Sequence, residues 1–152
     1  MHGYYDNDGK EYHQPKRVDW LTGMGTVVPR QAIEKIGYWD NQHFPQYHGD
    51  SDFTYRAKTQ GFNNVVHPAL IIYNNVSSTG IEHGGSLKAL FRTMTDLRSK
   101  TNFRVNLSFY RLHATSLRAY VPFTVSYLKV FGGFFKWKFL GIFGIRKKTH
   151  YR

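Results

Sequence analysis

The pattern of hydrophobic and polar positions predicts a strand followed by a short helix near the start of the folded chain. Residues 1–17 are polar without an apolar period, so we expect a loop or a frayed lead-in there. In residues 18–28, apolar side chains are interspersed with glycines, which is typical of a strand that another group approaches closely, or of a bulged strand. Pro29 ends this strand, and residues 30–36 place apolar side chains on one side of a helix that ends at Gly37.

A second helix and a second strand follow in the same pattern. The helix is expected to begin near Asp50 and to end at Gly61. Residues 62–73 are mostly apolar and predict a buried strand, which Pro68 interrupts because proline has no amide hydrogen to donate to a sheet. This order of strands and helices predicts a mixed α/β domain over residues 18–113.

The C-terminal part has helical spacing throughout. From residue 86 to about 120, apolar side chains recur at intervals of three and four. Beyond Pro122 the same spacing places five apolar side chains on one stripe: Phe123, Tyr127, Val130, Phe134 and Trp137. Lys129 and Lys136 fall on the opposite side, and three lysines interrupt a segment that would need about 20 nearly uncharged residues to span a membrane. We therefore expect residues 114–152 to form a helical, aromatic-rich tail that lies in a membrane interface, with the stripe towards the lipid. Packing of the same stripe on another half of the protein, outside this chain, is the alternative.

Charge is segregated along the chain. The 152 residues carry a formal net charge of +11 and include no cysteine, which fits a cytoplasmic chain and excludes thiolate chemistry. Residues 1–96 hold nine Lys or Arg against ten Asp or Glu, whereas residues 97–152 hold twelve Lys or Arg and no acidic residue. Such a basic block needs an anionic partner, which is a phospholipid headgroup, a nucleic acid, or an acidic or pyrophosphate-bearing ligand.

Two carboxylates stand at the expected start of the second helix. Asp50 and Asp52 follow an aromatic loop at residues 37–49, and Arg56 lies four residues after Asp52. Backbone amide groups and the helix dipole favour an ionised carboxylate at a helix N-terminus. Asp50 is therefore placed to act as a general base, while helix capping and an Asp52–Arg56 ion pair are the structural alternative for the same residues.

Three spaced motifs over about residues 18–113 resemble the acceptor-side half of the family 2 glycosyltransferases. The motifs are Trp20-Leu21-Thr22-Gly23, Gly37-Tyr38-Trp39-Asp40, and Gly49-Asp50-Ser51-Asp52-Phe53 with Arg56 and Gly61-Phe62. The resemblance implies the C-terminal half of a GT-A fold, the fold of nucleotide-diphospho-sugar transferases. It also implies a hexosyl transfer with inversion, in which a base deprotonates an acceptor hydroxyl and a nucleoside diphosphate leaves. Asp50 takes the position of that base.

The resemblance further implies which residues face the substrates. The expected substrate-binding residues are Trp20, Thr22, Gly23, Met24, Trp39, Asp52 and Arg56. Thr22, Gly23 and Met24 would lie beside the donor sugar, where glycine permits close approach. Trp39 is expected to stack on a sugar ring, with packing against the first helix as the equal alternative. The acceptor would be a glycan or a lipid-linked sugar in cell-surface polysaccharide synthesis.

Metal and donor binding belong to the N-terminal half of the family, which residues before 18 do not resemble. The complete enzyme is therefore expected to need Mg²⁺ or Mn²⁺ and a separate donor-binding half. His83 lies in a pattern, His83-Gly84-Gly85-Ser86, similar to one whose histidine approaches the metal in relatives. A histidine in a solvent-facing loop is the alternative.

The competing function is a non-catalytic remnant or a binding module. Its basic, aromatic tail would bind membrane or nucleic acid. Nucleic acid is disfavoured because the aromatic residues gather into apolar runs such as residues 131–135. We expect residues 119–148 to bind an anionic membrane surface peripherally, from the cytoplasmic side.

Overall fold

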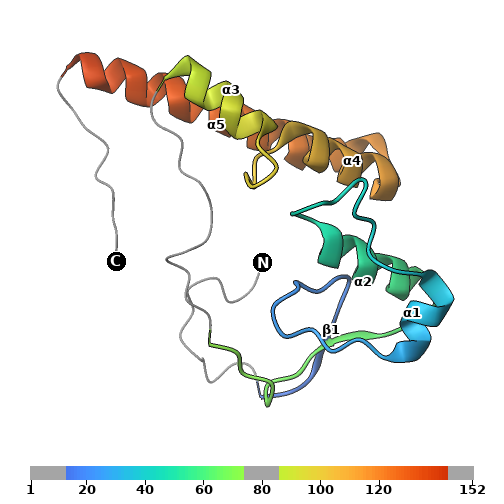
Figure 1. The fold of residues 1–152 in the computed structure, drawn as a ribbon. Helices are drawn as coiled ribbons and strands as arrows, with labels where there is room; N and C mark the ends of the chain where they lie inside the picture. Colours follow the sequence, from blue (N-terminus) through green and yellow to red (C-terminus); the bar gives the residue numbers. More distant parts are fainter. Residues whose placement is uncertain (1–12, 74–85, 144–152) are drawn as a thin grey trace. The chain divides into compact units, whose positions relative to one another are not determined.

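A computed structural model of the protein describes residues 13–73 and 86–143. The chain divides into two compact units, residues 1–78 and 79–152. Figure 1 shows the first unit as two short helices with a small sheet, and the second unit as helices. The protein is thus of mixed α/β composition and mostly helical. The division falls after residue 78, whereas the hydrophobic pattern places the start of the tail at residue 114.

The sheet of the first unit has two short antiparallel strands. β1 (Lys16–Val18) pairs with β2 (Asn64–Val66), with Arg17 opposite Val65. The prediction of a strand over residues 18–28 is wrong beyond its first residue, because the chain turns there and Gly25 adopts a φ of 70°. The second predicted strand is confirmed only around β2.

Both helices of the first unit begin and end close to the predicted residues. α1 (Arg30–Ile36) follows Pro29 and ends at Gly37, which has a φ of 79° that glycine adopts without strain. α2 (Gly49–Thr59) begins one residue before Asp50. The small core of this unit consists of buried apolar side chains from the two helices and the loop between them: Ala32, Phe44, Phe53 and Ala57.

The second unit breaks the predicted helical segment into two helices. α3 (Leu87–Thr95) is capped by Ser86, whose hydroxyl accepts from the Ala89 amide. α4 (Phe103–His113) begins after Asn102, a buried residue. The Asn102 side chain donates to the carbonyl of Thr95 at the end of α3 and accepts from the amide of Val105 in α4. One asparagine thereby satisfies backbone groups at both helix ends, which stabilises the break.

A single turn of 3₁₀ helix, η2 (Leu117–Ala119), leads into the long helix α5 (Tyr120–Ile142). Phe123 and Tyr127 of α5 pack against Phe103 of α4, with ring centroids 5.5 and 5.1 Å away. The Tyr127 hydroxyl donates to the Thr101 carbonyl and accepts from the Asn106 amide group. The predicted lipid-facing stripe is therefore wrong at its first two positions, because these rings form the contact between α4 and α5.

No helix in residues 13–73 and 86–143 combines the length and the apolar character needed to cross a membrane.

Candidate functional site

The Asp50 side chain stands exposed in the first turn of α2. The turn that leads into this helix is tight, since His48 adopts a left-handed φ of 67° and its carbonyl accepts from the Asp52 amide at 2.7 Å. Asp50 and Asp52 are the two acidic residues of the first turn, where the helix dipole favours negative charge. The predicted position of Asp50 at a helix N-terminus is thereby confirmed.

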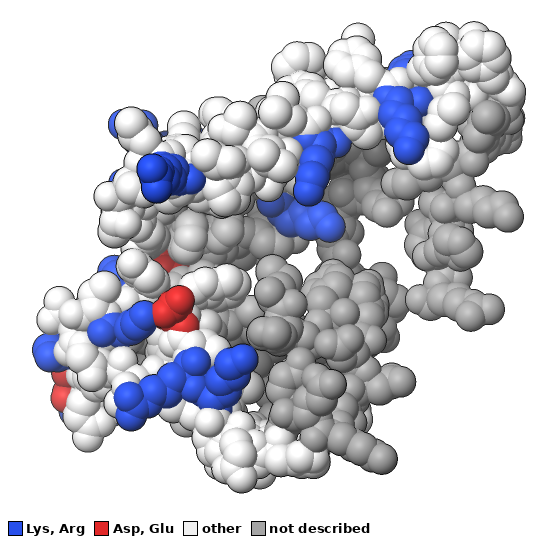
Figure 2. All heavy atoms as spheres, turned by 180° about the vertical axis from the view of Figure 1, so that it is seen from behind, with Lys and Arg blue, Asp and Glu red and all other residues white. Residues whose placement is uncertain are grey.

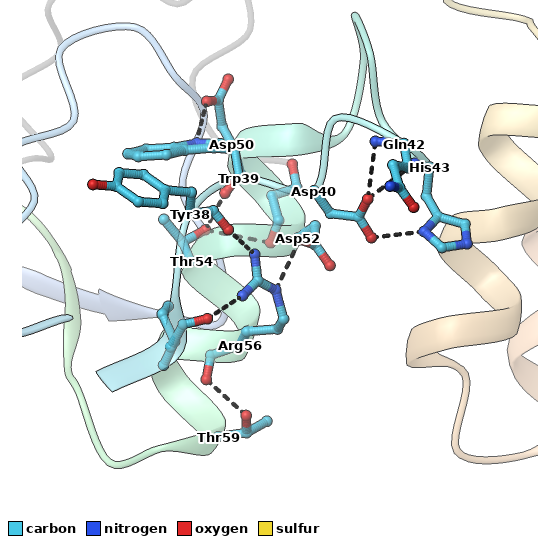
Figure 3. A network of polar contacts seen from close by, with 12 residues as sticks. Tyr38, Trp39, Asp40, Gln42, His43, Asp50, Asp52, Thr54, Arg56 and Thr59 are labelled. Atoms are coloured by element: carbon cyan, nitrogen blue, oxygen red, sulfur yellow. Dashed lines mark hydrogen bonds and ion pairs between the residues drawn. The ribbon is translucent and has the colours of Figure 1, made fainter. Parts of the chain in front are cut away.

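Trp39 holds the Asp50 carboxylate from one side. Its indole Nε1–H donates to Asp50 Oδ1 at 3.1 Å, as Figure 3 shows. The indole ring stacks on the buried Phe53 ring, with centroids 4.2 Å apart and an angle of 11° between the planes. The Trp39 ring thus packs on the core, but against α2 and not against the first helix as expected. The residue remains 39% exposed. A fixed indole N–H gives the carboxylate a defined orientation.

Gly23 lies against the same carboxylate. A Cβ atom at residue 23 would lie 2.1 Å from Asp50 Oδ2 and 2.5 Å from its Cγ, far inside van der Waals contact. Of the close approaches that the glycines of this segment suggested, the one at Gly23 is therefore made by Asp50, and the one at Gly25 is made by the Ile72 side chain. Only glycine leaves room for the carboxylate in this position.

Thr54 ties the segment that carries Gly23 to α2. Its buried hydroxyl accepts from the Leu21 amide at 2.9 Å and donates to the Asp50 carbonyl at 2.8 Å. Asn64, also buried, donates from its amide group to the carbonyls of Thr54 and Asp19. These bonds fix the distance between Gly23 and Asp50.

Asp52 and Arg56 hold the loop before α2 in place. The Arg56 Nε–H donates to Asp52 Oδ2 at 2.9 Å, and the Asp52 side chain is only 2% exposed. The other guanidinium nitrogens donate to the carbonyls of Ile36 and Tyr38, at 2.9 and 3.0 Å (Figure 3). The ion pair expected from the four-residue spacing is present, and it joins α2 to the end of α1 and the start of the loop.

Asp40 organises the same loop by a different set of bonds. Its Oδ1 accepts from the amides of Gln42 and His43, and its Oδ2 lies 2.7 Å from His43 Nδ1. The hydrogen bond from the His43 amide lowers the pKa of Asp40 below its ordinary value, against a smaller effect of burial. Loop residues 37–48 are thus held at their start by Arg56, and residues 40–43 within the loop are held together by Asp40.

A cavity of about 530 Å³ lies beside β1, and the expected substrate residues Trp20 and Thr22 line it. Lys16 and Arg17 of β1 contribute positive charge to its wall. Because Thr22 precedes Gly23 in the chain, the cavity wall is continuous with Gly23, which lies against Asp50. Met24, the next of the expected substrate-binding residues, is 60% exposed. Thr22 and Gly23 therefore link the cavity and the carboxylate along one stretch of backbone.

A metal site is not seen in the described residues. Among residues 13–73 and 86–143, no three His, Cys, Asp or Glu side chains gather as they would around a metal ion. His83, the predicted ligand, lies outside the described residues, so its assignment stays a prediction.

Comparison of the chain with protein-family models, with curated proteins and with solved structures finds no match. The assignment of a function therefore depends on the geometry around Asp50 and on the order of the three motifs.

Two residues of this site, Thr54 and Asn64, were not singled out from the sequence. Thr54 directly follows the Asp50–Phe53 motif, and Asn64 stands in a short strand. A buried polar side chain must find hydrogen-bond partners, but the sequence does not show which polar residues are buried. A threonine one turn after an acidic helix start is a weak signal, because its hydroxyl can bond the carbonyl four residues earlier.

Proposed function

We propose that this chain is the acceptor-side part of an inverting hexosyltransferase, with Asp50 as the general base. The observation that supports the proposal best is the placement of the exposed Asp50 carboxylate, bonded to the Trp39 indole and lying against Gly23. If Asp50 served only to cap α2, its carboxylate would need neither the bond to Trp39 nor the contact with Gly23. The order of the three motifs around these residues supports the same function.

The chemistry follows from the two oxygen atoms of the carboxylate. Oδ1 accepts the indole N–H of Trp39, which leaves Oδ2, on the side of Gly23, to take the proton of an acceptor hydroxyl. The hydroxyl oxygen then attacks the anomeric carbon of the sugar, the bond from that carbon to the nucleoside diphosphate breaks, and the configuration inverts. General-base assistance of this kind contributes about 10²–10⁴-fold to the rate.

The nucleotide-sugar and its Mg²⁺ or Mn²⁺ are assigned to a separate donor-binding part. The first unit offers that part exposed apolar side chains, since Val27, Ile71 and Ile72 are between 53% and 82% exposed. Large apolar patches on a protein surface often mark an interface with another protein surface. The donor sugar would then enter from the side of Thr22 and Gly23.

We assign the acceptor to the class of glycans or lipid-linked sugars of cell-surface polysaccharides, with the enzyme at the cytoplasmic face of a membrane. Twelve basic and no acidic residues after residue 96 support a location at an anionic surface. The alternative, a binding module without catalysis, predicts membrane binding but no dependence of any transfer on Asp50.

The test measures nucleoside diphosphate release by the chain together with its donor-binding part. The assay contains Mg²⁺ or Mn²⁺, a glycan acceptor and one of several donors, such as UDP-glucose, UDP-galactose or GDP-mannose. Asp50→Asn should lower the rate by at least about 10²-fold, because a carboxamide cannot accept the proton. The matched control is Glu34→Gln, which neutralises another exposed carboxylate, one that pairs with Arg30 in α1. Equal rates for both variants would disprove the assignment of the base.

A further inference from the structure

We infer that one exposed face of α5 is the surface that docks on an anionic lipid bilayer, and that it is the face opposite to the one the aromatic pattern suggested. Its apolar residues, called the outer stripe here, are Val121, Val125, Leu128, Phe135, Phe139 and Ile142. The inference rests on the proposed membrane location and is independent of the transfer chemistry.

The outer stripe is continuous along the helix. Its members are spaced by four, three, seven, four and three residues, and at about 100° per residue they fall within about 60° of one direction. They are between 40% and 79% exposed. Phe123 and Tyr127 point roughly the other way and pack against α4. The second unit therefore buries one apolar face of α5 and leaves a second one open.

Lysine side chains flank the outer stripe on both sides. By the same helical geometry, Lys129 and Lys136 lie about 70–90° to one side of its centre, and Lys138 lies about 90° to the other side. All three are exposed, and α5 has no acidic residue. Figure 2 shows several Lys and Arg side chains on the helical unit, among residues that are neither basic nor acidic. Lysines beside an apolar stripe can extend their stems along it and place their ammonium groups among lipid headgroups.

This arrangement favours lipid over the other possible occupants. A second copy of α5 packed on the same stripe would bring lysines of both copies close together, and like charges across a helix interface repel. A single-stranded nucleic acid needs aromatic rings for base stacking, whereas four of the six stripe residues are aliphatic. A bilayer accepts an apolar stripe and positive flanks together.

The first experiment measures flotation of the whole chain with vesicles of equal parts phosphatidylcholine and phosphatidylglycerol, and with pure phosphatidylcholine. The double variant Leu128→Ser and Phe135→Ser should lose binding at least tenfold at both low and high salt. Its control is Leu112→Ser, an exposed leucine on α4 that is 53% accessible. Lys129→Gln with Lys136→Gln should weaken binding about thirty-fold at low salt, since each charge contributes about fivefold at an anionic surface. The loss should shrink at high salt, and the control pair is Lys88→Gln with Lys100→Gln.

The second experiment identifies the inserted face directly. The chain has no cysteine, so single cysteines can carry an environment-sensitive fluorophore without removing native ones. Labels at Leu128→Cys and Phe139→Cys should shift to the blue and be quenched by spin-labelled lipid. A label at Ser126→Cys, on the other side of α5, should change little.

The possible results distinguish the lipid-binding face of α5 from the proposed membrane location and from the proposed role of Asp50. Vesicle binding that survives both double variants, or a label at residue 126 that inserts while residues 128 and 139 stay in water, overturns the assignment of this face. A wild-type chain that binds no vesicle, or binds a polyuridine probe instead, overturns both the face and the membrane location. Transfer activity, measured without lipid, bears only on Asp50.

Discussion

Replacing Gly23 by alanine tests the geometry of the site more sharply than removing the carboxylate of Asp50, the proposed base. The added Cβ would lie 2.1 Å from Asp50 Oδ2, whereas ordinary contact begins at 3.4 Å. The oxygen must therefore move by the difference, about 1.3 Å. A displacement of about 1 Å in a catalytic group can cost about 10²-fold in rate, so we expect a loss of kcat of that size.

The same change should hardly affect the free energy of unfolding. Asp50 is exposed and its carboxylate can rotate away, and the Gly23 φ does not lie in the left-handed region. The Trp39 indole N–H would lose its partner, so its proton resonance in a ¹H–¹⁵N spectrum should move upfield. Gly133→Ala is the control, because nothing lies within 4 Å of a Cβ placed there.

Two results would refute this reasoning. The first is a Gly23→Ala protein that keeps the wild-type kcat and an unchanged Trp39 resonance. The second is full additivity with Asp50→Asn. If Gly23 acts only through the position of the carboxylate, the double variant should be no slower than Asp50→Asn alone, because residues that act as a unit are not additive.

Three further predictions concern stability. Asp52→Asn should lower the free energy of unfolding by about 2 kcal/mol in urea titrations, because Arg56 loses a buried charged partner; an unchanged urea midpoint would contradict the structural role of Asp52. Tyr127→Phe should cost about 1–3 kcal/mol by the same measurement, since it leaves buried polar groups unsatisfied, and a neutral effect would count against the hydrogen bonds of its hydroxyl. The lowered pKa of Asp40 adds stability that is present above its ordinary pKa of about 3.9 and is lost as the pH falls through the lower, folded-state value. Urea midpoints should therefore fall at more acid pH in the wild type and less so in Asp40→Ala, and parallel curves would disprove the contribution.

The helices of the first unit were predictable because local signals mark both of their ends. Pro29 and Gly37 bound α1, and the acidic residues after Gly49 mark the start of α2. Helix ends depend on backbone conformation and on nearby side chains, and both are visible in a short stretch of sequence.

The extent of the first strand was not predictable for the opposite reason. Apolar residues continue beyond Val18, but the path of residues 19–25 is set by a hydrogen bond from the Leu21 amide to Thr54, 33 residues away. The sequence does not show that the Leu21 amide bonds to the Thr54 side chain and not to a neighbouring β-strand. The close approach implied by Gly23 was predictable, whereas its partner Asp50 was not.

The buried face of α5 shows a third kind of limit. The helix has apolar residues on two faces, and helical spacing alone cannot decide which of them is buried. The Tyr127 hydroxyl decides it, because its bonds to Thr101 and Asn106 require this face to lie on α4. A tyrosine in an otherwise apolar stripe is a signal of such polar anchoring.

The contact between Trp39 and Asp50 gives the site a built-in optical reporter. An indole whose N–H touches a carboxylate has an emission that depends on the charge and position of that carboxylate, and the partly exposed ring of Trp39 also meets solvent. The difference in fluorescence between the wild type and Trp39→Phe isolates this signal from Trp20 and Trp137. Binding of the proposed sugar ligands beside Trp39 can thus be tested by fluorescence alone, with neither a label nor a turnover assay.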